Sequence, residues 1–185
     1  MNTIISKRIL QILSISLSMF LILSGAGIAF ADFYTYVYTP KGTSVLAIYM
    51  TDELTPAQIA SGNNWVAVYY PNAVRLTNTS RKYNCHSYAW YNQSTNNSIW
   101  IDSPGDDIYW QDGSYLWITT AYGFVYPIPS NVPDGAKVSY GCDDHSAIKV
   151  SSTHFLSKWG QLPLMQHTPS HCPYYSYILS YYKHH

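Results

Sequence analysis

The stretch Tyr-Asn-Cys-His-Ser-Tyr-Ala-Trp-Tyr, residues 83–91, decides the fold expected for this chain. Within it, Cys85, Tyr88 and Ala89 recur at the spacing of one helix face. Asn84 is a favourable N-cap residue, so we expect a helix whose first turn contains Cys85. A thiolate is stabilised at such a turn by the positive end of the helix macrodipole.

Downstream of this helix, the sequence predicts short strands separated by turns. We expect strands at residues 136–140, 145–150 and 154–159, the last ended by Gly160. Residues 99–130 show aromatic patches between turns, which indicates short strands or irregular structure. The tail, residues 161–185, contains three prolines and is expected to be mostly irregular: Pro163, Pro169 and Pro173.

Upstream of residue 83, two strands and a second helix are expected. Residues 33–38 and 44–50 have strand character, with a turn at 39–42. Thr55 and Gln58 form a capping-box pattern around Pro56, which suits the first helical position. That helix runs toward Tyr69 unless Gly62 ends it early, and a short strand follows at 73–76.

The N-terminus has the pattern of a secretory signal peptide. Lys7 and Arg8 precede an apolar run at residues 9–22, and small residues at Ala29 and Ala31 fit the signal peptidase rule. We expect cleavage after Ala31 and export to the cell envelope or beyond, with no membrane anchor left. The alternative is an uncleaved membrane anchor over residues 9–30.

The remainder, residues 32–185, has the size of one domain. We divide it into an N-terminal strand-helix part (32–77), a catalytic core (78–160) and the tail (161–185). The chain contains 10 basic and 10 acidic residues without a basic face, so nucleic acid and anionic membranes are not expected partners. It also contains 19 tyrosines, which suit either half-buried strand positions or an aromatic surface that stacks on sugars.

The three cysteines are Cys85, Cys142 and Cys172. In an exported protein this odd number means a free or intermolecular thiol, or one pair plus a single thiol. We favour a disulfide between Cys142 and Cys172, which leaves Cys85 as the single thiol. The alternative is a zinc site, and its four ligands would be Cys142, His145, His171 and Cys172. Under the favoured pairing we expect no metal and no cofactor.

His145, the first residue of the strand at 145–150, is the expected partner of Cys85. An imidazole near a thiolate stabilises it and then serves as acid for the leaving group. His86 is the main rival for this role, although we expect it at the surface.

Three features follow one another in the sequence: a cysteine on a helix, a strand after Gly135, and the pattern His145-x-Ala147-x-x-Val150. This order resembles that of the papain-like cysteine hydrolases of bacterial envelopes. These are the NlpC-type peptidases and CHAP-type amidases, and the resemblance covers about residues 83–160. It implies a papain-like α+β fold, with N-terminal helices and with the nucleophile helix packed on a small antiparallel sheet. It also implies that Cys85 is the nucleophile and His145 the base.

A third residue would orient the imidazole, and the candidates are Ser157, Lys158, His154 and His167. We favour His167 slightly, since it could reach in from a loop. The oxyanion hole would use the backbone N–H of Cys85, with Tyr83 as the nearest side chain for the second donor.

We therefore expect an exported cysteine hydrolase that cleaves amide bonds, by resemblance in peptidoglycan peptides or a related wall polymer. The alternative is a wall- or glycan-binding domain without catalysis, which would use its tyrosines and exposed aromatics among Trp100, Trp110 and Trp117. A weaker third possibility is a secreted toxin or inhibitor. The oligomeric state has no signature in the sequence.

Overall fold

The computed structural model describes residues 31–123, 128–141 and 144–185. The expected signal peptide lies outside these ranges apart from Ala31, so it stays a prediction. Within the described ranges, no helix combines the length and the hydropathy needed to cross a membrane.

The described chain is a mixture of short helices and antiparallel strands. Its elements are, in order, β1 (Phe33–Tyr38), β2 (Ser44–Tyr49), α2 (Pro56–Tyr69), β3 (Val74–Arg75), η1 (Ser87–Tyr91), β4 (Ile99–Trp100), η2 (Gly105–Asp107), α3 (Ile108–Gln111), β5 (Tyr115–Tyr122), β6 (Lys137–Tyr140), β7 (His145–Lys149), β8 (Phe155–Lys158), β9 (Leu164–His167) and β10 (Ile178–His184). The strands form a three-stranded sheet, β1-β2-β4, and a seven-stranded sheet, β3-β9-β8-β7-β6-β10-β5. The expected α+β class is confirmed.

The tail, expected to be mostly irregular, contains two strands that the sequence did not predict. β9 pairs with β8, and β10 lies between β6 and β5 in the larger sheet. Alternation in β10 buries Leu179 and Tyr181, which are 2% and 0% exposed. The prolines of the tail lie between these strands rather than in them, so they do not prevent the pairing.

The upstream elements follow from local sequence. Strands β1 and β2 pair in register from Phe33 opposite Tyr49 to Tyr38 opposite Ser44. Thr55 and Gln58 form the predicted capping box of α2. The helix continues through Gly62 to Tyr69, and Gly62 is required because Thr79 packs too closely there for a Cβ atom.

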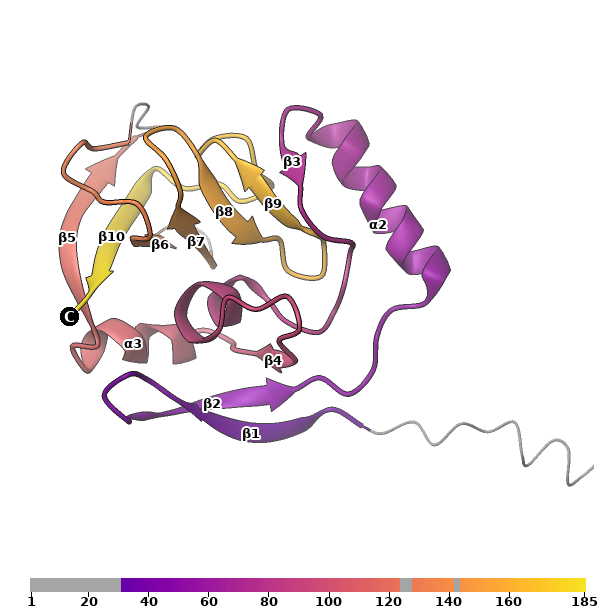
Figure 1. Cartoon of the computed structure of the whole chain (residues 1–185), viewed down its shortest axis with the longest axis horizontal. Coiled ribbons are helices and arrows are strands. Elements are labelled where there is room, and N and C mark those ends of the chain that lie inside the picture. The colour runs from indigo at the N-terminus through magenta and orange to yellow at the C-terminus, as the bar shows by residue number, and fades with distance from the viewer. Residues whose placement is uncertain (1–30, 124–127, 142–143) are drawn as a thin grey trace, which may run out of the picture. The chain divides into compact units, whose positions relative to one another are not determined.

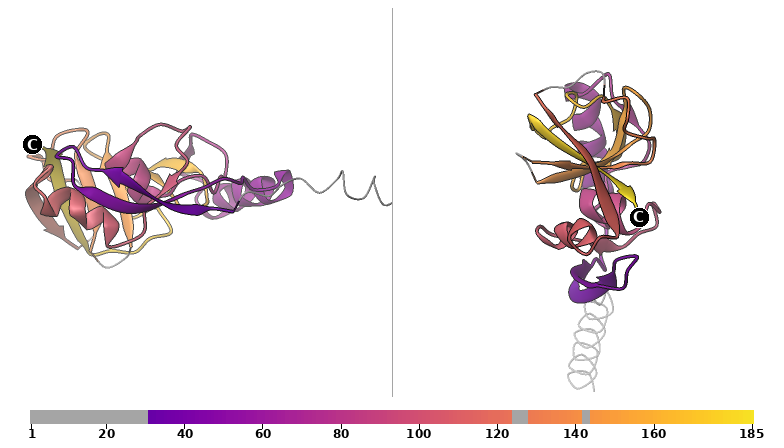
Figure 2. Two further views of the ribbon diagram at one scale, coloured as in Figure 1. Left: turned by 90° about the horizontal axis from the view of Figure 1, so that it is seen from below. Right: turned by 90° about the vertical axis from the view of Figure 1, so that its left-hand side faces the viewer.

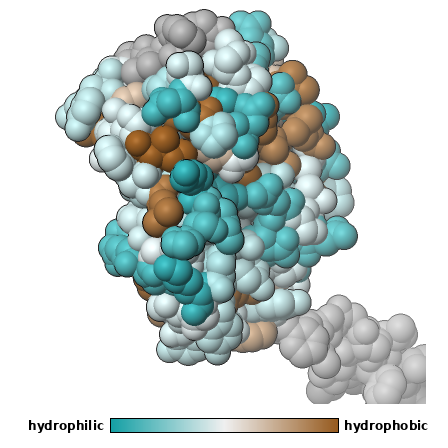
Figure 3. Space-filling view, turned by 60° about the vertical axis from the view of Figure 1, so that its left-hand side comes forward, coloured by the Kyte–Doolittle hydropathy of each residue, from teal (hydrophilic) through white to brown (hydrophobic). Residues whose placement is uncertain are grey.

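The larger sheet is covered on both faces. In β7, Ala147 belongs to one buried cluster and Ile148 to the other, as alternation requires. The cluster with Ile148 includes residues of η1 and of the β1–β2 hairpin, and η1 and α3 lie between the two sheets in Figures 1 and 2. The cluster with Ala147 includes Val66 of α2. On the face that Figure 3 shows, hydrophobic residues form separate small patches among hydrophilic ones.

Candidate functional site

Asn84 holds the turn in which Cys85 lies. Its Oδ1 accepts a hydrogen bond from the backbone N–H of Ser87 at 3.1 Å, as predicted for an N-cap. Its side-chain nitrogen donates to the carbonyl of Ile101 at 2.6 Å, which ties the turn to the end of β4. Cys85 itself is buried, with 4% exposure. Because η1 spans only five residues, its macrodipole is weak, and neighbouring side-chain charges matter more to the sulfur.

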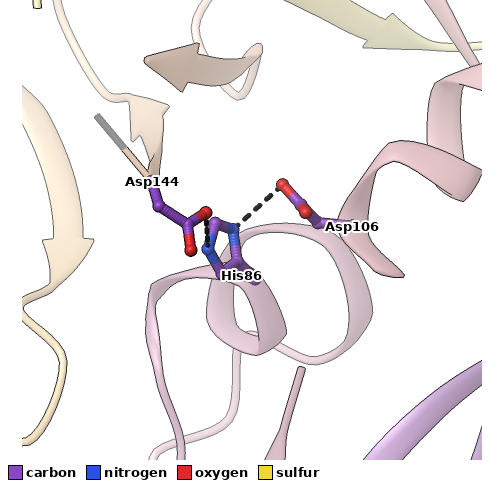
Figure 4. A group of neighbouring side chains, drawn as sticks. All are labelled: His86, Asp106 and Asp144. Carbon is purple, nitrogen blue, oxygen red and sulfur yellow. Dashed lines mark ion pairs between the residues drawn. The ribbon is translucent and has the colours of Figure 1, made fainter. Parts of the chain in front are cut away.

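The ring of His86, the next residue, is held by two carboxylates. Nδ1 lies 3.0 Å from Oδ2 of Asp106, and Nε2 lies 2.9 Å from Oδ1 of Asp144 (Figure 4). Oγ of Ser146 in β7 lies 2.9 Å from Nδ1. The expectation that His86 lies at the surface is wrong, because these groups cover it and leave 3% exposed.

This arrangement keeps His86 protonated. Burial alone would lower its pKa, but the charge of the Cys85 sulfur raises it. Hydrogen bonds to Asp106, Asp144 and Cys85 act in the same direction, and together these interactions hold the pKa well above its ordinary value. The hydrogen bond from His86 also lowers the pKa of Asp144. The sulfur of Cys85 therefore faces an imidazolium at neutral pH.

His145 begins β7 at the predicted position, but neither of its ring nitrogens is hydrogen-bonded to Cys85 in the described part of the chain. Alternation turns Ser146 toward η1, where it accepts a hydrogen bond from Trp90 at 2.8 Å, and turns His145 to the other face. There the ring stacks on Tyr174, with centroids 3.7 Å apart. Both ring nitrogens are buried without a hydrogen-bond partner among the described residues.

The ring of His145 is neutral. Burial, followed by the charges of His167 and His86, lowers its pKa well below the ordinary value. His86 and His145 thus have opposite protonation states at neutral pH. Such a pair is a frequent feature of sites that perform acid–base chemistry.

Two candidates for the orienting residue, Ser157 and His167, contact each other. Nδ1 of His167 donates to the carbonyl of Thr168 at 2.8 Å, so Nε2 accepts from the Ser157 hydroxyl at 2.7 Å. Trp159 also donates to that hydroxyl at 3.0 Å. Burial lowers the pKa of His167 to about 4. Neither residue is hydrogen-bonded to His145 in the described ranges, and the orienting role stays a prediction.

Lys158 and His154, the other candidates, lie in different surroundings. Nζ of Lys158 donates to the carbonyls of Ser80 and Gly160 at 2.7 and 2.6 Å. Burial lowers its pKa to about 7, and the charge of Cys85 offsets part of this decrease. His154 is hydrogen-bonded to the adjacent Thr153 hydroxyl at 2.8 Å.

Tyr83, the expected second oxyanion donor, is engaged elsewhere. Its ring lies beneath Nζ of Lys158, 5.0 Å from the centroid. Burial raises its pKa to about 12, and its hydroxyl is hydrogen-bonded to Thr77. The role of this hydroxyl as an oxyanion donor stays a prediction.

His86 and His145 line the same cavity, which has a volume of about 420 Å³. Its other lining residues are mostly polar: Ser103, Asp106, Asp107, Ser139, Tyr140, Gly141 and Asp144. Oδ1 of Asp106 is buried without a hydrogen-bond partner in the described part of the chain. The cavity thus combines fixed charge with polar groups that a ligand can engage.

Within residues 31–123, 128–141 and 144–185, one group of side chains could hold a metal ion: His86, Asp106 and Asp144. The two carboxylates face different nitrogens of the ring, as Figure 4 shows. This geometry suits a proton on each nitrogen better than one ion shared by three ligands.

The expected pairing of Cys142 with Cys172 stays a prediction, because Cys142 lies outside the described residues. The same applies to the alternative zinc site. Cys172 is buried, and its sulfur lies 3.2 Å from the carbonyl oxygen of Tyr174.

The sequence pointed to Cys85, but not to the groups that surround His86. Asp106, Asp144 and Ser146 come from segments far from residue 86 in the chain, and no local spacing links them to it. The only available signal was that Asp144 and Ser146 flank His145.

No protein-family model matches the chain, and neither does any curated protein or solved structure with which it was compared.

Proposed function

We propose that the chain is an exported cysteine hydrolase that cleaves amide bonds, in peptidoglycan peptides or a related wall polymer. Cys85 is the nucleophile, His86 is the cation that stabilises its thiolate, and His145 is the base. The observation that supports this most directly is the interaction of the Cys85 sulfur with an imidazolium fixed by two carboxylates.

The architecture is compatible with a papain-like fold. The helical turn with Cys85 and η1 packs against β6, β7 and β8 of an antiparallel sheet. His145 begins a strand of that sheet, as the sequence resemblance requires. The few, short helices are a departure from the N-terminal helices that we expected.

His86 itself is a poor base because two carboxylates hold its proton. Its role in the proposal is electrostatic: a fixed positive charge beside the sulfur stabilises the thiolate. His145 is neutral and has a lone pair available, and it lines the same cavity. The proposal requires that this ring comes within hydrogen-bond reach of Cys85 when substrate binds, since catalytic contacts are often long in the free enzyme.

In the proposed cycle, the Cys85 thiolate attacks the amide carbon. The carbon–nitrogen bond breaks as the leaving nitrogen takes a proton from solvent, and a thioester remains. His145 then takes a proton from the water that attacks the thioester. The carbon–sulfur bond breaks, which restores the thiolate, and His145 releases its proton to solvent.

The proposal is tested with a suspension of peptidoglycan and three variants. Cys85→Ala should abolish clearing and amine release, and His145→Asn should reduce turnover by roughly 10³-fold or more at every pH. His86→Asn should lower turnover most at acidic pH, where the thiolate depends on the neighbouring cation. Each variant should keep a cooperative unfolding transition. Clearing of the wall by the Cys85→Ala protein would overturn the proposal.

A further inference from the structure

The outward face of the β1–β2 hairpin presents a row of tyrosines. Alternation along β1 exposes Tyr34, Tyr36 and Tyr38 to 75%, 62% and 61%. On the opposite face Val37 is buried in the core, at 4% exposure. The three tyrosines make no hydrogen bond or ring contact with other residues in the described part of the chain. Alternate residues of a strand are about 7 Å apart, so the rings form a regular row.

The partner strand extends this row with apolar side chains. Leu46 lies opposite Tyr36 and is 50% exposed, and Ile48 lies opposite Tyr34. Strand propensity explains tyrosine in β1, but it does not explain why exposed rings share a face with exposed aliphatic groups. In Figure 3, the end of the molecule with this hairpin is mostly pale, the intermediate hydropathy typical of tyrosine. The outward face of the hairpin therefore combines exposed aromatic rings with aliphatic side chains.

The row leads into a hollow beside the candidate site. Tyr34, Leu46 and Ile48 line a cavity of about 390 Å³ together with the segment from Asp102 to Gly105. Ser103 of that segment also lines the cavity that contains His86 and His145. A ligand that lies along the tyrosines and fills this hollow therefore ends beside the cavity of His86 and His145.

The chemistry of the hollow indicates its ligand. It offers aromatic and aliphatic surface with polar groups from Asp102, Ser103 and Gln111, and its lining contains no lysine or arginine. A sugar ring has an apolar C–H face that packs on tyrosine and hydroxyls that hydrogen-bond to such groups. A polyanion would find no cation in this lining and would face the carboxylate of Asp102.

We propose that the tyrosine row and the hollow bind a strand of neutral polysaccharide and hold it beside the Cys85 site. The placement of this strand as part of the substrate rests on the proposed hydrolase function. The binding itself does not require catalysis.

The test is co-sedimentation of the full chain with chitin, an insoluble and uncharged polymer of N-acetylglucosamine. The Tyr34→Ala/Tyr36→Ala protein should bind at least roughly fivefold more weakly than the original chain. Tyr36→Phe, which keeps the ring, should bind normally. Tyr122→Ala is the matched control because Tyr122 is 72% exposed on β5 of the other sheet, and it should change binding by less than about twofold.

Equal binding by the double variant and the original chain would overturn the inference. Preferential binding of soluble poly(glycerol phosphate) would also overturn it. A dimer through the β1 edge would do the same if the double variant abolished the dimer without any effect on glycan binding. All measurements are repeated with Cys85→Ala. If the chain binds glycan normally but never cleaves wall peptides, only the proposed hydrolase function is rejected. If the chain cleaves them but its glycan binding does not depend on the tyrosines, only the proposed polysaccharide binding is rejected.

Discussion

Nδ1 of His86 and Oδ2 of Asp106 lie 3.0 Å apart, and the two side chains are only 4% and 5% exposed. A buried ion pair of this kind contributes little net stability when both partners are present, but the loss of one partner leaves an uncompensated charge. The pair therefore fixes the charge beside Cys85 and makes the site sensitive to either residue.

Asp106→Asn should lower the free energy of unfolding by about 3 kcal/mol, since a buried imidazolium loses one of its carboxylates. It should also lower the pKa of His86. Urea unfolding at neutral pH and an NMR titration of His86 measure the two effects. Asp144→Asn is the control: the side chain of Asp144 is 65% exposed, and its loss should cost less than about 1 kcal/mol. An equal decrease in the free energy of unfolding in the two variants would show that Asp106 and Asp144 hold the His86 ring equally strongly, contrary to this expectation.

The two histidines should make stability depend on pH in opposite directions. The folded-state pKa of His86 is raised, so its contribution is complete below about 6.5, the unfolded value, and is lost as pH rises through the folded pKa. The pKa of His145 is lowered, so its contribution is present above the unfolded value and is lost as pH falls toward the folded pKa.

Urea unfolding at a series of pH values separates the two contributions. His86→Asn should flatten the decline in stability on the alkaline side, and His145→Asn should flatten the decline on the acid side. The reverse assignment of the slopes would show that the protonation states inferred for these rings are wrong.

Ser146 should be important for the stability of the site. Its hydroxyl accepts from Nε1 of Trp90 at 2.8 Å and lies 2.9 Å from Nδ1 of His86. Ser146→Ala leaves the buried indole N–H without a partner, which should cost about 1–3 kcal/mol in chemical denaturation. Ser94→Ala, in an exposed loop, should change stability by less than about 0.5 kcal/mol. A neutral Ser146→Ala variant would show that this hydroxyl does not hold the two side chains.

Elements set by local sequence could be predicted. The capping box at Thr55 and Gln58, the N-cap at Asn84 and the hairpin β1–β2 all depend on residues close in the chain. The start of β7 at His145 was also predicted, from the strand character of residues 145–150.

Long-range pairing could not be predicted in the same way. β10 lies between β6 and β5, and nothing within residues 178–184 specifies these neighbours. The burial of His86 likewise depends on Asp106 and Asp144, which only the folded chain brings to its two ring nitrogens. Cys85 could be identified as a candidate, but the origin of its neighbouring charge could not.

In the proposed function, the Cys85 sulfur acts as a reactive thiolate beside a fixed imidazolium. Alkylation by iodoacetamide of the native chain at about pH 5, followed by mass spectrometry of each cysteine peptide, tests it most directly. We expect rapid, selective modification of Cys85 that slows by roughly tenfold or more in His86→Asn. A Cys85 that reacts only after unfolding, or equally fast in both proteins, would contradict the claim.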